Sequence, residues 1–153
     1  MTMTDTFLRG VFHTRLDDKN RVKVPKILVD IIRTQGRSCV VMLMPEPCLG
    51  VYSDREWTRI WNPRPSDTPL FAPASLKGLE MSRILGSRTW SFTLEPQGRI
   101  TISDLCRDYA GLSLDREVAI VGTENRIELW DREMWEKHIS TIAGDFKSML
   151  EQS

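Results

Sequence analysis

Residues 16–25 of the chain read LDDKNRVKVP, and residues 94–102 read LEPQGRITI. Both stretches place an acidic residue four positions before an arginine, and the two arginines, Arg21 and Arg99, lie 78 positions apart. Working outward without a gap, the same shift matches identical residues: Leu16/Leu94, Asp30/Asp108, Val40/Val118, Glu46/Glu124 and Trp57/Trp135. The chain therefore contains two copies of a unit of roughly 45 residues, each too small to bury a good core alone.

The same order of elements is predicted in each copy. Two short strands flank a turn that is rich in residues tolerating left-handed backbone, as in a hairpin, and a helix, two buried strands and a closing helix follow. The expected strands are 11–16, 21–24, 39–44 and 48–52 in copy one, and 89–94, 99–102, 117–122 and 126–130 in copy two. The expected helices run from Pro25 to near Gly36, from Asp54 through Trp57, from Ser75 to Gly86, from Ser103 to Gly111, and from Asp131 through Met149.

The chain is expected to form one fused body of the α/β class, because both copies must share a core. Prolines between the copies predict an exposed loop. The expected organisation is an N-terminal extension (1–10), repeat 1 (11–57), a Pro-rich loop with a linker helix (58–88), repeat 2 (89–134) and a C-terminal helix (135–153).

Composition excludes several classes of function. With 21 basic and 21 acidic residues the formal net charge is zero, so a nucleic-acid or membrane partner must be met by a local patch. Cys39, Cys48 and Cys106 lack CxxC spacing, and only two histidines could join them, which predicts a reduced protein without a metal or cofactor. No signal peptide or membrane-length apolar run is present in the sequence, which favours the cytoplasm and no membrane partner.

The repeated acidic–arginine pair has the least obvious structural purpose. A two-stranded ribbon fits the DNA major groove, and a guanidinium can bond guanine or phosphate with two hydrogen bonds. In this interpretation Asp17 orients Arg21, and Glu95 orients Arg99, toward the DNA. The structural alternative is that each carboxylate and arginine only pin the turn to each other. From spacing alone this alternative is favoured, since surface ion pairs are common and contribute about 0 to 1 kcal/mol.

Local charge favours DNA binding for copy one. Between positions 13 and 26, five basic residues against two acidic ones leave a charge of +3, whereas Arg99 against Glu95 and Asp104 leaves −1 between positions 93 and 104. We therefore expect Arg21 to read base edges and Arg99 to contribute more weakly. The residues expected to meet phosphates are Arg15, Lys19 and Lys23.

The two turn strings, joined to Ile127-Glu128-Leu129-Trp130-Asp131, resemble the MraZ family of bacterial transcriptional regulators from about Arg9 to Trp135. The resemblance implies two swapped-hairpin half-barrels of the AbrB-like kind, interleaved into one pseudo-twofold, mainly β barrel with short helices. It also implies a ring-shaped homo-oligomer that binds double-stranded DNA. The implied targets are promoter direct repeats upstream of its own cell division and cell wall gene cluster, with a nucleoid-associated location.

Three positions depart from the family pattern. Asn20 stands where the first turn usually has Gly, and asparagine tolerates positive φ. In the second motif Glu95 stands for the usual Asp and is followed by Pro96, and Ser103 occupies the position that matches Pro25. These departures favour a smaller DNA-binding role for copy two.

Other functions are open to test. Asp17 and Asp18 could be paired catalytic carboxylates, but neighbouring positions on a basic turn favour a solvated tip, and His13 and His138 have no nucleophile elbow to serve. We therefore expect no enzyme. A protein-binding, antitoxin-like module of the same fold is the main alternative, favoured by the zero net charge and the altered second motif.

The apolar side chains lead to two further expectations. Trp57 and Trp135 occupy the same repeat position, which favours packing in the core or between subunits over base stacking. The linker and final helices carry more apolar side chains than one short chain is expected to cover, which predicts a homo-oligomer. These side chains include Leu79, Ile84, Ile139, Ile142 and Phe146.

Overall fold

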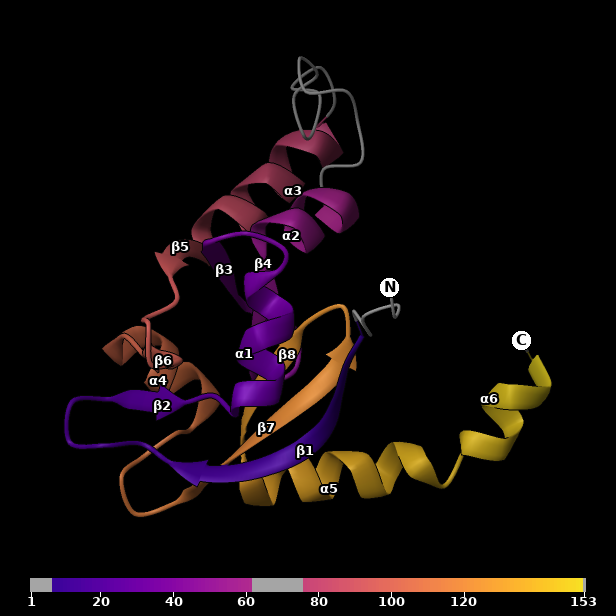
Figure 1. The fold of residues 1–153 in the computed structure, drawn as a ribbon. Coiled ribbons are helices and arrows are strands. Elements are labelled where there is room, and N and C mark those ends of the chain that lie inside the picture. Colours follow the sequence, from indigo (N-terminus) through magenta and orange to yellow (C-terminus); the bar gives the residue numbers. More distant parts are fainter. Residues whose placement is uncertain (1–6, 62–75, 153) are drawn as a thin grey trace, which may run out of the picture.

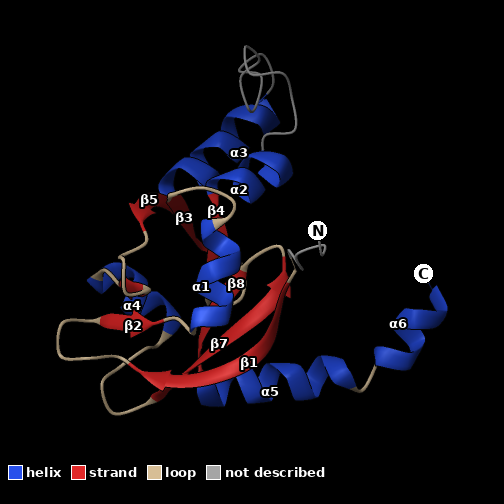
Figure 2. Cartoon of the chain, in the orientation of Figure 1, coloured by secondary structure: helices blue, strands red, loops and turns tan. Residues whose placement is uncertain are grey.

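The computed structural model describes residues 7–61 and 76–152 as a mixed α/β protein (Figures 1 and 2). Its strands are β1 (Leu8–Arg15), β2 (Arg21–Lys23), β3 (Ser38–Leu43), β4 (Leu49–Ser53), β5 (Thr89–Thr93), β6 (Arg99–Thr101), β7 (Glu117–Glu124) and β8 (Ile127–Asp131). Its helices are α1 (Lys26–Arg33), α2 (Asp54–Trp61), α3 (Leu76–Ser87), α4 (Asp104–Ala110), α5 (Arg132–Ala143) and α6 (Phe146–Gln152). The predicted elements are therefore present in the predicted order, and none of the described helices is long and apolar enough to cross a membrane.

The strands pair across the two halves of the chain. Six of them form an antiparallel sheet in the order β1-β7-β8-β4-β3-β5, and β2 pairs antiparallel with β6 in a separate ribbon. The first strand of each half thus lies beside a strand of the other half, β1 on β7 and β5 on β3. The prediction of a hairpin between the first two strands of each half is wrong, because β1 and β2 share only the hydrogen bonds of their turn and each of these strands pairs with the other half. Within each half, β3 pairs with β4 and β7 pairs with β8.

This exchange has a simple energetic reason. The central residues of the ribbon, Val22 and Ile100, lie opposite one another and are both almost fully buried. Each half alone has too few apolar side chains to cover such a strand, whereas pairing across the halves buries both strands in one shared core.

The described strands form an open sheet. Its outer strands, β1 and β5, pair with no further strand within the described residues, so the expected closed barrel is not confirmed. The central pair, β4 and β8, is symmetric about Gly50 and Glu128, which lie opposite one another at positions related by the repeat.

The ungapped repeat is wrong by one residue in β3 and β7. Arg15 lies opposite Glu117, but its repeat equivalent Thr93 lies opposite Ser38, so these strands are related by a shift of 79 (117 − 38 = 79). Val41 accordingly packs on the same core as Ile120. Since a slip of one residue turns every side chain to the other face, the matches Val40/Val118 and Leu43/Val121 are not structural equivalents. Glu46 lies outside β3, in the turn before β4, whereas Glu124 ends β7.

Helices cover both faces of the sheet. On one face, α1 and α4 pack with the ribbon over a core that includes Leu28, Ile32 and Cys106. On the other, Tyr52 meets Trp57, and Trp130 meets Trp135, each pair edge to face with ring centroids 5.5 Å apart. The predicted packing role of the two repeat-related tryptophans is confirmed.

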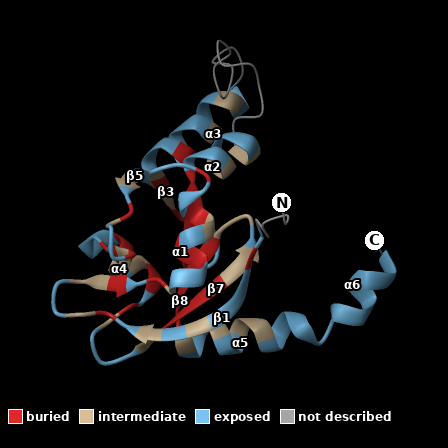
Figure 3. Ribbon diagram, viewed as in Figure 1, coloured by how far each residue is buried: buried red, intermediate tan, exposed pale blue. Residues whose placement is uncertain are grey.

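The ends of the predicted segments differ from expectation. β1 begins at Leu8, a buried residue within the segment expected as an extension. The final helix is two helices, α5 and α6, because the chain breaks near Gly144, and α6 is exposed along its length (Figure 3). In α3, Leu85 is the buried residue, and Leu79 and Ile84, named above for the predicted homo-oligomer, are exposed. The proline-rich loop and residues 1–6 lie outside the described residues.

Candidate nucleic-acid interface

The first turn, residues 17–20, is held by the Asp17 carboxylate. Its Oδ1 accepts hydrogen bonds from the backbone N–H groups of Lys19 and Arg21, both at 2.9 Å, and its Oδ2 accepts one from Arg21 Nε at 2.7 Å. Asn20 completes the turn with a φ of 58°, and its N–H donates to the Asp17 carbonyl. The predicted orientation of Arg21 by Asp17 is present, so the guanidinium leaves the turn in a fixed direction.

These hydrogen bonds keep Asp17 ionised. Desolvation alone would raise the pKa of this carboxyl, but the hydrogen bonds from the backbone and guanidinium of Arg21 and from the backbone of Lys19 together outweigh it. The pKa of Asp17 therefore lies below its ordinary value, and the charged pair persists at neutral pH.

The second turn, residues 95–98, repeats the pair with looser geometry. Arg99 Nε lies 3.1 Å from Glu95 Oε2, and the Glu95 carbonyl accepts a hydrogen bond from Arg33 Nη2 of α1 at 2.6 Å. Gly98 takes the left-handed position with a φ of 81°. The second turn is thus tied to a helix of the other half of the chain.

The two left-handed residues, Asn20 and Gly98, have different neighbours at equivalent sites. The Asn20 side-chain oxygen accepts a hydrogen bond from Arg107 Nη1 of α4 at 3.3 Å. A Cβ on Gly98 would lie 2.8 Å from Cγ2 of Val29, the residue that matches Arg107 in α1. Each turn residue therefore suits the helix residue beneath it. Arg107 carried no sequence signal, because this contact joins positions 87 apart.

The structure joins both motifs in one ribbon. Because Val22 and Ile100 point into the core, the flanking residues of β2 and β6 share the opposite, outer face. Arg21 lies opposite Thr101 there, and Lys23 lies opposite Arg99. Hydrogen bonds from Val24 N to Gly98 O and from Ile102 N to Asn20 O extend the ribbon into both turns. The sequence suggested two separate arginine-bearing turns, one in each half. In the fold, both turns belong to one basic surface and lie at its two ends.

Of the three residues predicted to meet phosphates, Lys19 and Lys23 lie on the ribbon and its turn, and Arg15 does not. Lys19 is exposed on the first turn, as predicted, and Lys23 is on the outer face. Arg15 instead ends β1 opposite Glu117. The pKa of Glu117 is lowered chiefly by its hydrogen bond from Arg132, and the nearby charge of Arg15 lowers it further. Arg15 thus ends β1 near the Glu117 carboxylate and is not part of the β2–β6 ribbon.

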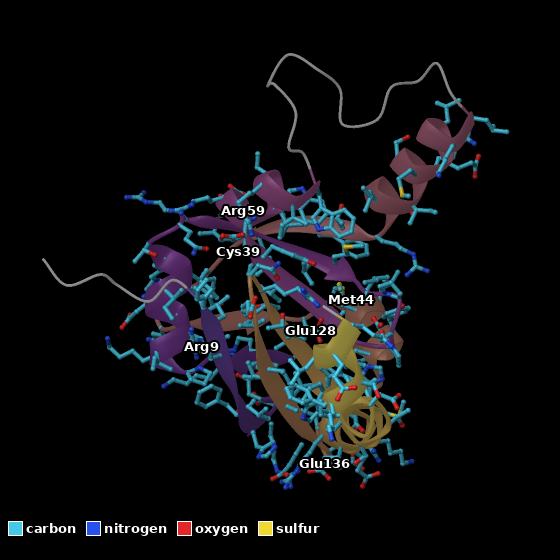
Figure 4. The ribbon with its side chains drawn as sticks, turned by 90° about the vertical axis from the view of Figure 1, so that its right-hand side faces the viewer. Arg9, Cys39, Met44, Arg59, Glu128 and Glu136 are labelled. Carbon is cyan, nitrogen blue, oxygen red and sulfur yellow. The ribbon has the colours of Figure 1, made fainter. Side chains whose placement is uncertain are left out.

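Away from the ribbon, Glu128 and His138 already have partners, and the three cysteines are free. Glu128, near the centre of the molecule (Figure 4), accepts hydrogen bonds from Trp130 Nε1 at 2.9 Å and from Arg126 Nη2 at 2.7 Å. The three cysteines are free and buried, and burial raises the pKa of the Cys39 thiol to about 11. His138 of α5 stacks on Trp130 with ring centroids 4.9 Å apart. Within the described ranges, no cluster of three or more His, Cys, Asp or Glu residues could hold a metal.

Comparisons with known proteins agree with the resemblance. The model of the MraZ protein family, described as antitoxin-like, matches residues 87–151. Three relatives, each named transcriptional regulator MraZ, match most of the chain. The protein of Clavibacter michiganensis is 30% identical over 94% of this chain and 94% of its own length. That of Salinispora arenicola is 32% identical over 93% and 94%. That of Thioalkalivibrio sulfidiphilus is 34% identical over 84% and 83%. By identity and coverage together, the chain belongs to the MraZ family.

Proposed function

We propose that this chain is a sequence-specific DNA-binding transcriptional regulator, without catalytic activity, that reads DNA with the outer face of the β2–β6 ribbon. The observation that carries the proposal is the joining of Arg21, Lys23 and Arg99 on one face of a two-stranded antiparallel ribbon. Such a ribbon fits the major groove, where arginine can bond guanine with two hydrogen bonds. The name of the relatives, transcriptional regulator, supports the same class.

The roles proposed for single residues follow from their positions. Asp17 orients Arg21, which contacts base edges, and Glu95 orients Arg99 at the other end of the ribbon. Lys19 and Lys23 contact phosphates and set the position of the ribbon on the duplex. Arg15 is the weakest of the predicted contacts, because its charge lies near the Glu117 carboxylate.

A neutral protomer binds DNA weakly, so we propose that affinity comes from several ribbons presented together in a ring-shaped homo-oligomer. The spacing of subunits then sets the spacing of the direct repeats in the promoter of its own cell division and cell wall gene cluster. Within each subunit, the two halves would complete a pseudo-twofold swapped-hairpin barrel. The protein would work in the cytoplasm, on the nucleoid.

A second candidate is a protein-binding module of the same fold without specific DNA binding. The description of the family as antitoxin-like and the zero net charge favour it. The two candidates differ in one respect, since only a DNA reader loses affinity steeply with salt and discriminates between duplexes.

The test is the affinity of the purified chain for a duplex from the promoter of its own gene cluster and for a scrambled duplex, across a salt series. Arg21→Ala should weaken promoter binding by about 1–3 kcal/mol for each guanine that Arg21 binds in the complex, and should reduce discrimination. Lys19→Ala and Lys23→Ala should lower affinity for both duplexes alike and flatten the salt dependence. Arg55→Ala, an exposed position on α2 away from the ribbon (Figure 1), is the charge-matched control.

Equal losses on both duplexes for Arg21→Ala would make Arg21 a phosphate contact. Absence of salt-dependent binding by the unaltered chain would reject the DNA-binding proposal and leave the protein-binding candidate.

A further inference from the structure

The fold rearranges the charges that the sequence places around each turn. Counted along the chain, Lys23 and Lys26 belong to the first turn. In the structure, however, both line a cavity of about 260 Å³ together with Pro96 and Gln97 of the second turn. Lys26 opens α1, and this helix lies against the second turn because Arg33 binds the Glu95 carbonyl. Exchange of strands between the halves thus carries cations of copy one to the turn of copy two.

A second cavity continues this surface. It has a volume of about 410 Å³ and is lined by Arg33 and Arg37 from the first half and by Thr93, Leu94 and Pro96 from the second. The two cavities share Arg33 and Pro96. Around the second turn, five cations (Lys23, Lys26, Arg33, Arg37 and Arg99) therefore face two carboxylates (Asp30 and Glu95), for a net charge of +3.

The first turn has the opposite surroundings. Arg107 of α4 contacts Asn20 and forms ion pairs with Asp104 and Asp108, so α4 brings two carboxylates beside this turn. The charged residues there are Asp17, Asp18, Asp104 and Asp108 against Lys19, Arg21 and Arg107, for a net charge of −1. In the folded chain the net charge is −1 around the first turn and +3 around the second, which is the reverse of the charges counted along the sequence.

Two cations of the second turn are available to a ligand. Across residues 7–61 and 76–152, neither Lys23 nor Arg37 takes part in an ion pair. Lys26 is paired with Asp30 at 2.7 Å, but both side chains are largely exposed, and such pairs exchange readily with an external anion. Lys23 also lies on the outer face of the ribbon, so the basic surface is continuous with the proposed base-reading face.

We propose that Lys23, Lys26, Arg33 and Arg37 form a binding site for phosphates of the duplex DNA backbone, and that this site makes the second turn the stronger backbone-contacting end of the ribbon. The inference rests on the proposed DNA-binding function. Phosphates of duplex DNA are the expected ligand for two reasons. The cationic surface continues the outer face of the ribbon, and a row of cations along a groove edge matches the regularly spaced negative charges of the DNA backbone. Each protomer then sits on DNA with a defined polarity, its second turn bound more tightly than its first.

The experiment compares Lys26→Ala and Arg37→Ala with Lys19→Ala of the first turn and with the control Arg55→Ala. Affinity for the promoter duplex and for the scrambled duplex is measured between about 50 and 200 mM salt. Each phosphate contact that is lost lowers the steepness of log K against log[salt] by about 0.9 and lowers affinity about tenfold near 0.1 M salt, so a variant loses this amount once for each engaged subunit of the proposed ring. Thermal melting of each variant checks that it is folded.

We expect Lys26→Ala and Arg37→Ala to weaken binding to both duplexes, each by more than Lys19→Ala, with Arg55→Ala unchanged. If the unaltered chain binds the promoter duplex while Lys26→Ala and Arg37→Ala behave like Arg55→Ala, the phosphate site is rejected and the DNA-binding proposal stands. A larger loss for Lys19→Ala overturns the ranking of the two ends. If the unaltered chain binds neither duplex, both proposals fall together.

Discussion

At the scale of single residues, the two turns meet the same backbone requirement with different pairs of a turn residue and a helix residue. Both turns need a residue with positive φ, and the chain uses Asn20 in one and Gly98 in the other. Asparagine is accommodated where Arg107 donates to its side chain, whereas glycine is needed where Val29 fills the space. The turn chemistry was predictable, because it depends on neighbours in sequence. The helix residue beneath each turn was not, because it comes from the other half.

Gly98→Ala should destabilise the protein by about 1–3 kcal/mol, since alanine is strained at positive φ and its Cβ would lie against Val29. The measurement is urea unfolding followed by tryptophan fluorescence. Gly86→Ala is the matched control, because Gly86 lies in α3 with open space around it and alanine favours a helix by about 0.5–1 kcal/mol. Equal stability of the two variants would contradict the close approach of Val29.

At the scale of elements, side chains cap three helices close to the starts that the sequence predicts. Ser53 accepts a hydrogen bond from Glu56 N, Ser103 from Cys106 N, and Asp131 from Met134 N. The predicted unbroken final helix is wrong because Gly144 ends α5, and glycine is a poor helix former. The spacing of apolar residues predicted that the helix continues past Gly144. The side chains after Gly144, in α6, are exposed and lie outside the core.

Asp131 should make the stability of the protein sensitive to acid. This buried carboxylate caps α5 and binds Arg116 through two hydrogen bonds of 2.6 and 2.9 Å, and the Arg116 bonds are the main cause that lowers its pKa. The pKa of Asp131 is lower in the folded protein than in the unfolded chain. The ionised carboxylate therefore stabilises the folded protein fully above about pH 5, and this stabilisation is lost as the pH falls through the folded-state pKa. Asp131→Asn keeps a cap but loses the ion pair, and should cost about 1–2 kcal/mol at neutral pH.

The check is the midpoint of thermal unfolding between acid and neutral pH. The difference between the unaltered chain and Asp131→Asn should shrink below the ordinary carboxyl pKa, near 3.8. Asp115→Asn is a suitable control, because Asp115 is exposed and its lowered pKa comes first from a hydrogen bond with the neighbouring Ser113. A difference that stays constant down to acid pH would show that the Arg116 pair does not carry the effect.

At the scale of the whole molecule, exposed apolar side chains predict self-association. The predicted surplus is present on α3, α5 and α6, where Ile84, Ile142 and Phe146 expose 47%, 37% and 61% of their surface. α6 extends away from the body of the protein (Figure 1), so its apolar side chains are open to a second molecule. A set of apolar side chains of this extent is typical of an interface with another copy.

Static light scattering at micromolar concentration should therefore give a mass well above that of one chain, 17.6 kDa. The double variant Ile142→Ser with Phe146→Ser should lower this mass, because two apolar side chains of the interface become polar, while Arg55→Ala should leave it unchanged. A monomeric mass for the unaltered chain would contradict the oligomer and with it the proposed ring.

The elements and the acidic–arginine turns could be predicted from the sequence, because they depend on the chemistry of residues a few positions apart, and the repeat could be found by aligning the chain with itself. The pairing of the strands, the one-residue offset of β3 and β7, and the charges that surround Arg21 and Arg99 became clear only from the fold. These features depend on contacts between the halves, because two halves too small to bury all their strands exchange some of them. The exchange carries α1 to the turn of copy two and α4 to the turn of copy one, so charge counted along the chain is not the charge that a ligand meets.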